Sequence, residues 1–173
     1  MTEIELKPEH AADPATRRVG ILVGVVGVLL SVVTIASHRA HTSAVIHRTE
    51  SNDLWTYYQA KKIRASQSAA ALTVLQALSA DPAKIAPAVR KLEAARDHYG
   101  ADAQDIQIQA RAKDAQTMVD ENRALRYDIG EGFLELGLVL CSLYFLARKS
   151  FFPIFGVLAG IAGGLMGLWG LLL

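Results

Sequence analysis

Three long runs of apolar residues constrain the fold of this chain more than any other feature. They cover residues 19–37, 129–147 and 151–173, with lengths of about 19, 19 and 23 residues. A helix needs roughly 20 apolar residues to cross about 30 Å of hydrocarbon. Each run is therefore predicted to form a transmembrane helix.

The first run could also be a secretory signal, because Arg17 and Arg18 precede it and Ala36 follows it. It is longer than a typical signal core, and His38 and Arg39 make a poor cleavage neighbourhood. We therefore interpret it as a retained membrane anchor.

The chain before this anchor is expected to be a flexible tail. Residues 1–12 are polar and show no sustained period. Asp13 and Pro14 then form a helix start, because the carboxylate can cap free backbone N–H groups and proline lacks the N–H that a first turn leaves unbonded. The first transmembrane helix is predicted over residues 13–37.

Residues 38–128 are predicted to form a helical hairpin outside the bilayer. Neither proline nor glycine occurs between residues 37 and 79, so the anchor helix should continue unbroken to a length of about 65 residues. Asp81 and Pro82 are expected to end this helix and to cap the next one.

The return arm of the hairpin is predicted in two parts. A second helix should run to about His98 and stop at Gly100, because glycine is common at helix ends. A third helical stretch should start near Ala101 and Asp102 and continue through Arg126 into the second apolar run.

Spaced apolar side chains predict how the two arms pack. On the first arm they are Leu54, Tyr58, Ala65, Leu72 and Leu75. On the return arm they are Ile108, Ala112, Ala115 and Val119. Intervals of three and four place side chains on one helix face, as in a coiled coil. The stripes are therefore expected to face each other in an antiparallel pair.

The predicted fold class is all-α: an integral membrane protein with three transmembrane helices and a long extramembrane antiparallel helical hairpin continuous with the first and second spans. The second span covers residues 129–147, and residues 148–173 hold a basic turn and the third span.

Short basic segments predict the orientation. Arg17 and Arg18 precede the first span, and Arg148 and Lys149 form the turn before the third, so the N-terminus is expected to be cytoplasmic and the hairpin outside. The hairpin side also carries arginines next to the spans. They count for less, because long loops translocate largely regardless of their charge.

Small residues recur on two predicted spans at intervals of three and four. On the third span they are Gly156, Gly160, Gly163, Gly167 and Gly170. On the first span they are Gly20, Gly24, Gly27 and Ser31. Such seams let helices approach closely in lipid, either within one chain or between the chains of an oligomer. A pore-lining role is a third interpretation, although helical glycine offers an ion only backbone groups that are already bonded.

Two carboxylates, Glu131 and Glu135, lie four residues apart on the second span and so share a helix face. Carboxylates in a membrane are costly and normally face protein or water. Glu131 is close enough to the boundary to reach headgroup water. Glu135 is expected to pair with Arg126, to share a proton with Glu131, or to meet a basic group of another chain. A structural role and a proton or cation site both remain open.

The remaining polar residues do not form a pattern that is typical of a metal site or a catalytic site. His38, His41 and His47 cluster after the first span, but no cysteine joins them, so we predict interfacial histidines and no metal site. Cys141 is expected to pack as a small apolar residue. The sequence shows no nucleophile motif or phosphate-binding loop, so we predict no enzyme activity and no cofactor. The net charge of +1 gives no reason to expect nucleic acid.

One segment combines aromatic and basic residues on the hairpin. Trp55, Tyr57, Tyr58 and Lys61 lie within it. The aromatic rings either fill the hairpin seam near the membrane or form a surface for a partner, since aromatic residues make good interface anchors.

At this segment the sequence resembles an uncharacterised bacterial membrane-protein family catalogued as domain of unknown function 4337. The likeness includes the Asn52-Asp53 pair, Trp55 and the string over residues 57–61, and it extends to the glutamate-bearing entry to the second span at residues 127–131. The resemblance implies the same arrangement of spans and a bacterial inner-membrane location. It names no catalytic residue.

The sequence therefore predicts a non-enzymatic membrane scaffold or accessory subunit that assembles through its glycine seams and its hairpin arm. The expected partners are membrane lipid and either further copies of the chain or a larger membrane complex. The alternative is an oligomeric ion or proton channel or transport component that uses Glu131 and Glu135. It also requires an oligomer, because three spans do not easily enclose a pathway.

Overall fold

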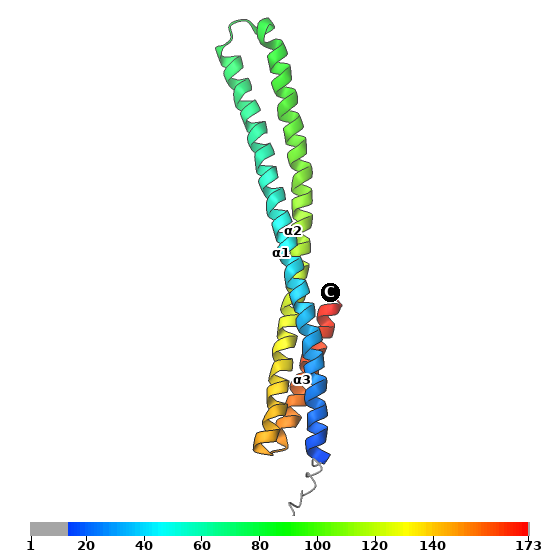
Figure 1. Ribbon diagram of the computed structural model, residues 1–173. Helices are drawn as coiled ribbons and strands as arrows, with labels where there is room; N and C mark the ends of the chain where they lie inside the picture. The colour runs from blue at the N-terminus through cyan, green and yellow to red at the C-terminus, as the bar shows by residue number, and fades with distance from the viewer. Residues whose placement is uncertain (1–13, 173) are drawn as a thin grey trace, which may run out of the picture. The chain divides into compact units, whose positions relative to one another are not determined.

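The computed structural model of the protein describes residues 14–172, which form three α-helices and contain no strand. The helices are α1 Pro14–Leu78, α2 Pro82–Ala147 and α3 Phe151–Leu171 (Figure 1). The tail predicted over residues 1–12 and the cap predicted at Asp13 lie outside the described residues. The helices divide into a three-helix unit, residues 14–41 and 121–172, and a two-helix unit, residues 42–120.

The all-α class is confirmed, and α1 has the predicted length. It is 65 residues long and unbroken, as the lack of proline and glycine between residues 37 and 79 indicates. At the start of α2, the backbone N–H of Ala83 donates a hydrogen bond of 3.1 Å to the side chain of Asp81. The predicted cap at Asp81 is therefore confirmed.

The predicted break in the return arm is wrong, because α2 runs through His98 and Gly100 and is 66 residues long. An interior glycine costs a helix only about 1 kcal/mol relative to alanine. Ala103, Ile106 and Ala110 follow it and are buried, so packing against α1 outweighs the local cost.

In the two-helix unit, the predicted stripe on α1 lies on the inner face. Leu72 is buried, and the other members are half-buried: Leu54, Tyr58, Ala65 and Leu75.

The stripe predicted on α2 is wrong. Ile108 is 64% exposed and Val119 is 46% exposed, and Ala112 and Ala115 are exposed as well. The buried residues on this part of α2 are Ala103, Ile106, Ala110, Thr117 and Asp120. Two of them are polar, so a search for apolar residues alone shifts the stripe to the wrong face.

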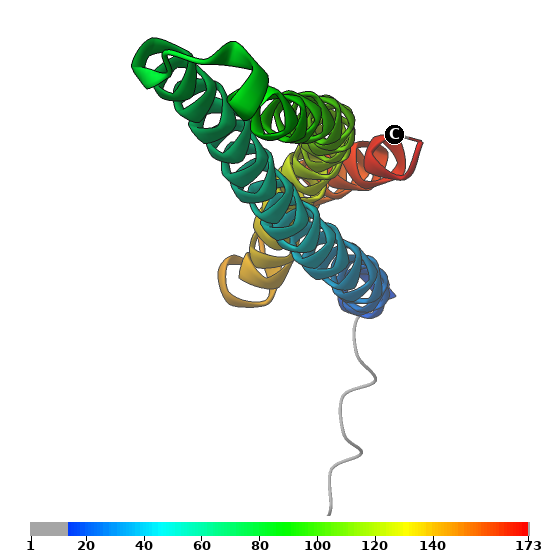
Figure 2. The same cartoon turned by 90° about the horizontal axis from the view of Figure 1, so that it is seen from above.

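The three-helix unit packs around one apolar cluster. Its buried members are Val26, Val33 and Ala40 of α1 with Ala124, Tyr127 and Leu134 of α2. In this unit α3 lies beside the C-terminal part of α2 (Figures 1 and 2). All three helices contain stretches long and apolar enough to cross a membrane.

Within the three-helix unit, α2 and α3 touch through their backbones. A Cβ atom on Gly163 would lie 2.6 Å from the carbonyl oxygen of Gly130 and 2.9 Å from the backbone nitrogen of Leu134. A Cβ atom on Gly137 would lie 2.8 Å from the carbonyl oxygen of Gly156. Only glycine permits this approach, and it places the glycine face of α3 inside the chain.

Replacing Gly163 by alanine is expected to destabilise the three-helix unit, because the new Cβ would overlap backbone atoms of α2. Overpacking of this kind costs about 1–3 kcal/mol, which should lower the thermal unfolding midpoint in mild detergent. Gly164→Ala is the matched control, since a Cβ there meets nothing within 4 Å. Equal midpoints for the two variants would contradict the backbone contact.

Candidate functional site

The polar residues between α1 and α2 are organised around carboxylates of α2. In the two-helix unit, the hydroxyl of Ser51 donates to Asp114 at 2.5 Å, and the indole N–H of Trp55 donates to the same carboxylate at 3.0 Å. Ser51 is only 2% exposed. Two donors from α1 therefore bind one carboxylate of α2.

The same arrangement recurs at Asp120. The hydroxyl of Ser43 donates to its carboxylate at 2.8 Å, and Nδ1 of His47 lies 2.8 Å from the same oxygen. Asp120 is 7% exposed, so the site is buried between the helices. A buried carboxylate without such donors would be strongly unfavourable.

A third copy of the arrangement lies in the three-helix unit. The hydroxyl of Ser37 donates to Asp128 at 2.6 Å, and Nε2 of His41 lies 3.0 Å from the second carboxylate oxygen. Three residues before Ser37 on α1, the hydroxyl of Thr34 donates to Glu131 at 2.7 Å. Glu131 therefore has a hydrogen-bond partner within the chain.

These three sites share one pattern, which we call the carboxylate clamp: a serine and, four residues later, a ring nitrogen on α1, facing one aspartate on α2. Residues four apart on a helix point to the same side, which is why both donors reach one carboxylate. The clamps are Ser37–His41–Asp128, Ser43–His47–Asp120 and Ser51–Trp55–Asp114. The repeated serine and ring spacing was present in the sequence as a signal, and our sequence analysis missed it.

Ion pairs add to the clamps in the two-helix unit. Nζ of Lys61 lies 2.6 Å from Asp102, and Nζ of Lys113 lies 2.6 Å from Glu50. The ammonium group of Lys61 holds the pKa of the Asp102 carboxyl below its ordinary value. Both pairs are partly accessible to solvent, and such ion pairs contribute little to stability individually, so we regard them as secondary to the clamps.

The predicted partner surface divides into an inner and an outer part. Trp55 and Tyr58 are half-buried and meet edge to face with ring centroids 5.5 Å apart. Lys61 bonds to Asp102 and lies over the ring of Tyr57 at 5.2 Å from its centroid. Only the ring of Tyr57, which is 53% exposed, remains largely open.

The histidines near the first apolar run serve different neighbours. His41 faces Asp128 and His47 faces Asp120, while His38 is exposed. Within residues 14–172, no three His, Cys, Asp or Glu side chains come together closely enough to hold a metal ion.

The expected pair between Glu135 and Arg126 does not form. The guanidinium of Arg126 lies 4.1 Å from the centroid of the Trp169 ring, a cation–π contact that occupies it on the α3 side. Glu135 is exposed, and no hydrogen bond or ion pair joins it to another residue within 14–172. Arg126 therefore contacts the ring of Trp169, a pairing that the sequence pattern did not predict.

Glu135 belongs to a face of the three-helix unit that is largely open. Ser31 of α1 lies between Gly27, which faces Leu138, and Thr34, which bonds to Glu131, so Ser31 and Glu135 are at the same level. We call this surface the outer face. It comprises the small residues Gly20, Gly24, Gly27 and Ser31 of α1 together with Glu135 and Ser142 of α2.

The outer face is distinct from the glycine face of α3. A Cβ atom on Gly20 or Gly24 would meet nothing within 4 Å, whereas Cβ atoms on Gly160 and Gly167 would contact Val26 and Val33 of α1. The two seams thus differ: the α3 seam is filled by the chain itself, and most of the α1 seam is not.

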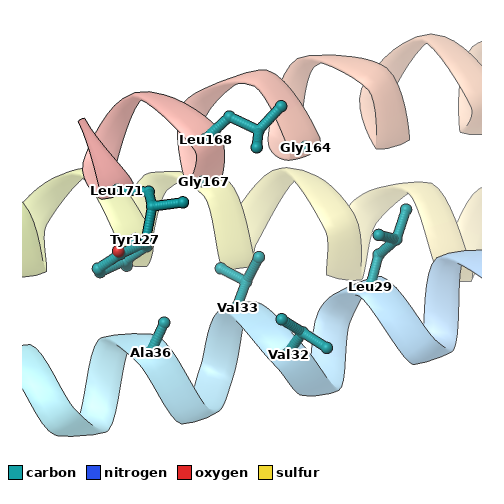
Figure 3. Close-up of a pocket in the computed structure, with 9 residues that line it drawn as sticks. All are labelled: Leu29, Val32, Val33, Ala36, Tyr127, Gly164, Gly167, Leu168 and Leu171. Carbon is teal, nitrogen blue, oxygen red and sulfur yellow. The ribbon is translucent and has the colours of Figure 1, made fainter.

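An apolar pocket of about 180 Å³ lies between α1, α2 and α3 (Figure 3). Aliphatic side chains line it, including Val33 and Leu168, and Tyr127 closes one end. Neither Glu131 nor Glu135 lines this pocket, so it offers no connected polar path to the two carboxylates.

The family model described as Domain of unknown function (DUF4337) matches residues 15–173. The chain belongs to this family. The match confirms the resemblance carried by the aromatic string around Trp55. No curated protein and no solved structure matches the chain. The description of this family states no activity.

Replacing Asp114 by asparagine is expected to lower the thermal stability of the protein at neutral pH. The Ser51 hydroxyl and then the Trp55 N–H hold the pKa of the Asp114 carboxyl below its ordinary value of 3.8. A lowered pKa means that the ionised clamp stabilises the fold above that value and that this contribution is lost as the pH falls through the folded pKa.

The difference in melting temperature between wild type and Asp114→Asn should therefore be present at pH 7 and shrink below about pH 4. Asp105→Asn is the control, because Asp105 is exposed and makes no hydrogen bond within residues 14–172. A difference for Asp114→Asn that stays the same from pH 7 to pH 3 would rule out the ionised clamp.

Proposed function

We propose that the protein is a non-enzymatic membrane scaffold or accessory subunit with three transmembrane helices, which assembles with another membrane-protein chain through its outer face. The observation that carries this proposal is the exposed, unpaired carboxylate of Glu135 on an apolar part of α2. Carboxylates in a membrane normally face protein or water.

The depth of Glu135 makes lipid an unfavourable neighbour. Glu135 lies about 12 residues before the end of α2 at Ala147, or about 18 Å along the helix axis. The hydrocarbon layer is about 30 Å thick, so this position is well inside it if Arg148 and Lys149 lie at its edge. An acidic side chain near the centre of a span costs about 3 kcal/mol on insertion scales.

The neighbours of Glu135 suit another helix. Gly20, Gly24 and Ser31 allow a second backbone to approach closely, and Ser31 and Glu135 supply polar groups at the same level. Hydrogen bonds between transmembrane helices contribute about 0.6–2 kcal/mol each. A covering helix with a donor at this level would relieve the carboxylate.

The α3 glycine seam is not part of this proposed interface. Its five glycines are buried against α1 and α2 of the same chain. The proposal therefore assigns assembly to the seam of α1, and it assigns the seam of α3 to packing within one chain.

The two-helix unit supplies the proposed arm outside the membrane. Two carboxylate clamps and two ion pairs hold its helices in antiparallel register, since partner positions on α2 fall as those on α1 rise. Tyr57 is the exposed ring of the proposed partner surface. The basic segments at residues 17–18 and 148–149 support a cytoplasmic N-terminus with the arm outside, in a bacterial inner membrane.

A second candidate is an ion or proton transport component. The observation that favours it is that Glu135 and Glu131 line one face, where a second chain would enclose them. Proton flux into liposomes that depends on Glu135, and that falls in Glu135→Gln, would support transport. Flux equal to that of empty liposomes would favour the scaffold.

The protein extracted into native nanodiscs is expected to have a mass greater than one chain, either as several copies or with a second protein. Ser31→Trp should reduce it to single chains, because the indole fills the outer face beside Glu135. Leu165→Trp is the control, since Leu165 is 62% exposed on α3 and lies away from that face.

Mass spectrometry of the intact complexes measures this directly and identifies any second protein. A single chain for wild type, or equal loss of assembly in both tryptophan variants, would contradict the proposed outer-face contact.

A further inference from the structure

An apolar groove lies between the first turns of α1 and the first turns of α3, within the three-helix unit. Its volume is about 450 Å³. The apolar lining comes from both helices and includes Val19, Leu22, Ile154, Val157 and Leu158. The groove lies beside the turn between α2 and α3, because Ser150 of that turn also lines it.

Positive charge gathers at this end of the groove. Arg18 lines it, Arg17 precedes Arg18 in the same turn of α1, and Arg148 and Lys149 come from the α2–α3 turn. The guanidinium Nη1 of Arg148 donates to the hydroxyl of Thr16 at 2.9 Å, which holds it against the start of α1. No Asp or Glu occurs in residues 14–27 or 144–158 to balance these cations.

The backbone of Arg148 has an unusual conformation at the end of α2. Its φ is 54°, in the left-handed region where glycine is the least strained residue. Strained positions tend to occur at functional sites, where another interaction compensates for the strain. An arginine thus occupies a position at which glycine would end the helix more easily.

The groove also contains an unpartnered polar group. Tyr144 of α2 lines the groove and is 7% exposed. Within residues 14–172 no group forms a hydrogen bond with its hydroxyl. A tyrosine hydroxyl can donate and accept hydrogen bonds, so this one can bond to a polar atom of a ligand that enters the groove.

We propose that this groove binds one anionic phospholipid of the surrounding leaflet, with its phosphate held by Arg18, Arg148 and Lys149 and an acyl chain lying against the apolar wall. Basic pockets between transmembrane helices on the cytoplasmic side bind anionic headgroups in this way. The inference rests on the proposed membrane location. It does not depend on whether the chain assembles with another.

A bilayer phospholipid fits the groove better than a free phosphate does. The long apolar wall formed by residues such as Val157 gives an inorganic ion nothing to bind, whereas an acyl chain gains by covering it. The cations at one end match a headgroup charge, and they lie at the end that the distribution of basic residues places in the cytoplasm.

The test uses the full chain in nanodiscs that contain equal amounts of phosphatidylglycerol and phosphatidylcholine, followed by native mass spectrometry of the released protein. Wild type is expected to retain phosphatidylglycerol in preference to phosphatidylcholine. Each cation removed should weaken retention by about fivefold, so the combined Arg18→Gln, Arg148→Gln and Lys149→Gln variant should lose the preference. Arg111→Gln, an exposed change in the two-helix unit, should retain the wild-type preference.

A second pair of variants tests the apolar wall. Val157→Trp should displace the lipid by filling the groove, while Ile161→Trp, one turn further along α3 and outside the lining, should not. Equal retention of the two lipids by wild type would overturn the proposal, as would retention that is unchanged in the triple variant and in Val157→Trp. That result would be expected if another segment of the chain or a second copy filled the groove.

The same spectra separate this inference from the proposed assembly. The protein mass reports whether chains associate, and the added lipid mass reports binding in the groove. Single chains that retain phosphatidylglycerol would refute the assembly and support the lipid site. Assemblies without a lipid preference would do the reverse.

Discussion

Carboxylates of α2 that accept hydrogen bonds from α1 organise the α1–α2 pair in both units, and Asp120 is the buried one among them. Desolvating an ionised carboxylate without partners costs far more than any single apolar contact contributes. Each clamp supplies donors from one side of α1 to one aspartate of α2. Because hydrogen bonds require specific distances and angles, a clamp fixes which residues are opposite each other, while alanine and leucine tolerate several registers.

The clamps also explain why apolar packing can be thin. The seam of the two-helix unit contains small residues such as Ala103 and Ala110 and polar ones such as Ser51 and Thr117. Such a seam gains little from burial of apolar area alone. We infer that the directional bonds to Asp114 and Asp120 provide the specificity that larger apolar side chains provide in an ordinary coiled coil.

The three-helix unit uses a different device for α3. Glycines at the α2–α3 contact bring backbones together, a form of packing that does not require large apolar side chains. Two surfaces of this unit that remain open carry polar side chains without a hydrogen-bond partner in the described part of the chain. Glu135 on the outer face and Tyr144 in the apolar groove between α1 and α3 are polar residues whose side chains form no hydrogen bond within residues 14–172.

The extents of the helices could largely be predicted from the sequence, because they depend on the lengths of the apolar runs and on the positions of helix-breaking residues. The three apolar runs, the unbroken α1 and the cap at Asp81 follow from such local rules. These local rules did not predict that α2 continues through Gly100, because that continuation depends on packing against α1. The α2 stripe failed for a related reason, since Thr117 and Asp120 occupy buried positions that an apolar pattern excludes.

The candidate sites were less predictable than the helices. Glu135 was recognisable as an unusual carboxylate, but the direction of Arg126 towards Trp169 depends on where α3 lies. The clamps combine residues that are far apart in sequence, such as Ser51 and Asp114. The sequence of α1 alone shows only the spacing of a serine and a ring residue. That spacing indicates a site only once the aspartates of α2 are known to lie opposite it.

The most direct test of the clamp account is a distance measurement between nitroxide labels at two exposed sites of the two-helix unit, Ile46 on α1 and Ala112 on α2. Pulsed electron resonance should give one narrow distance distribution for the otherwise wild-type protein. Replacing both Asp114 and Asp120 by leucine should keep the helices, as judged by circular dichroism, but broaden the distribution or add a second maximum, because the apolar seam admits more than one register. An unchanged narrow distribution would contradict the claim that the carboxylate clamps set the register of α1 and α2.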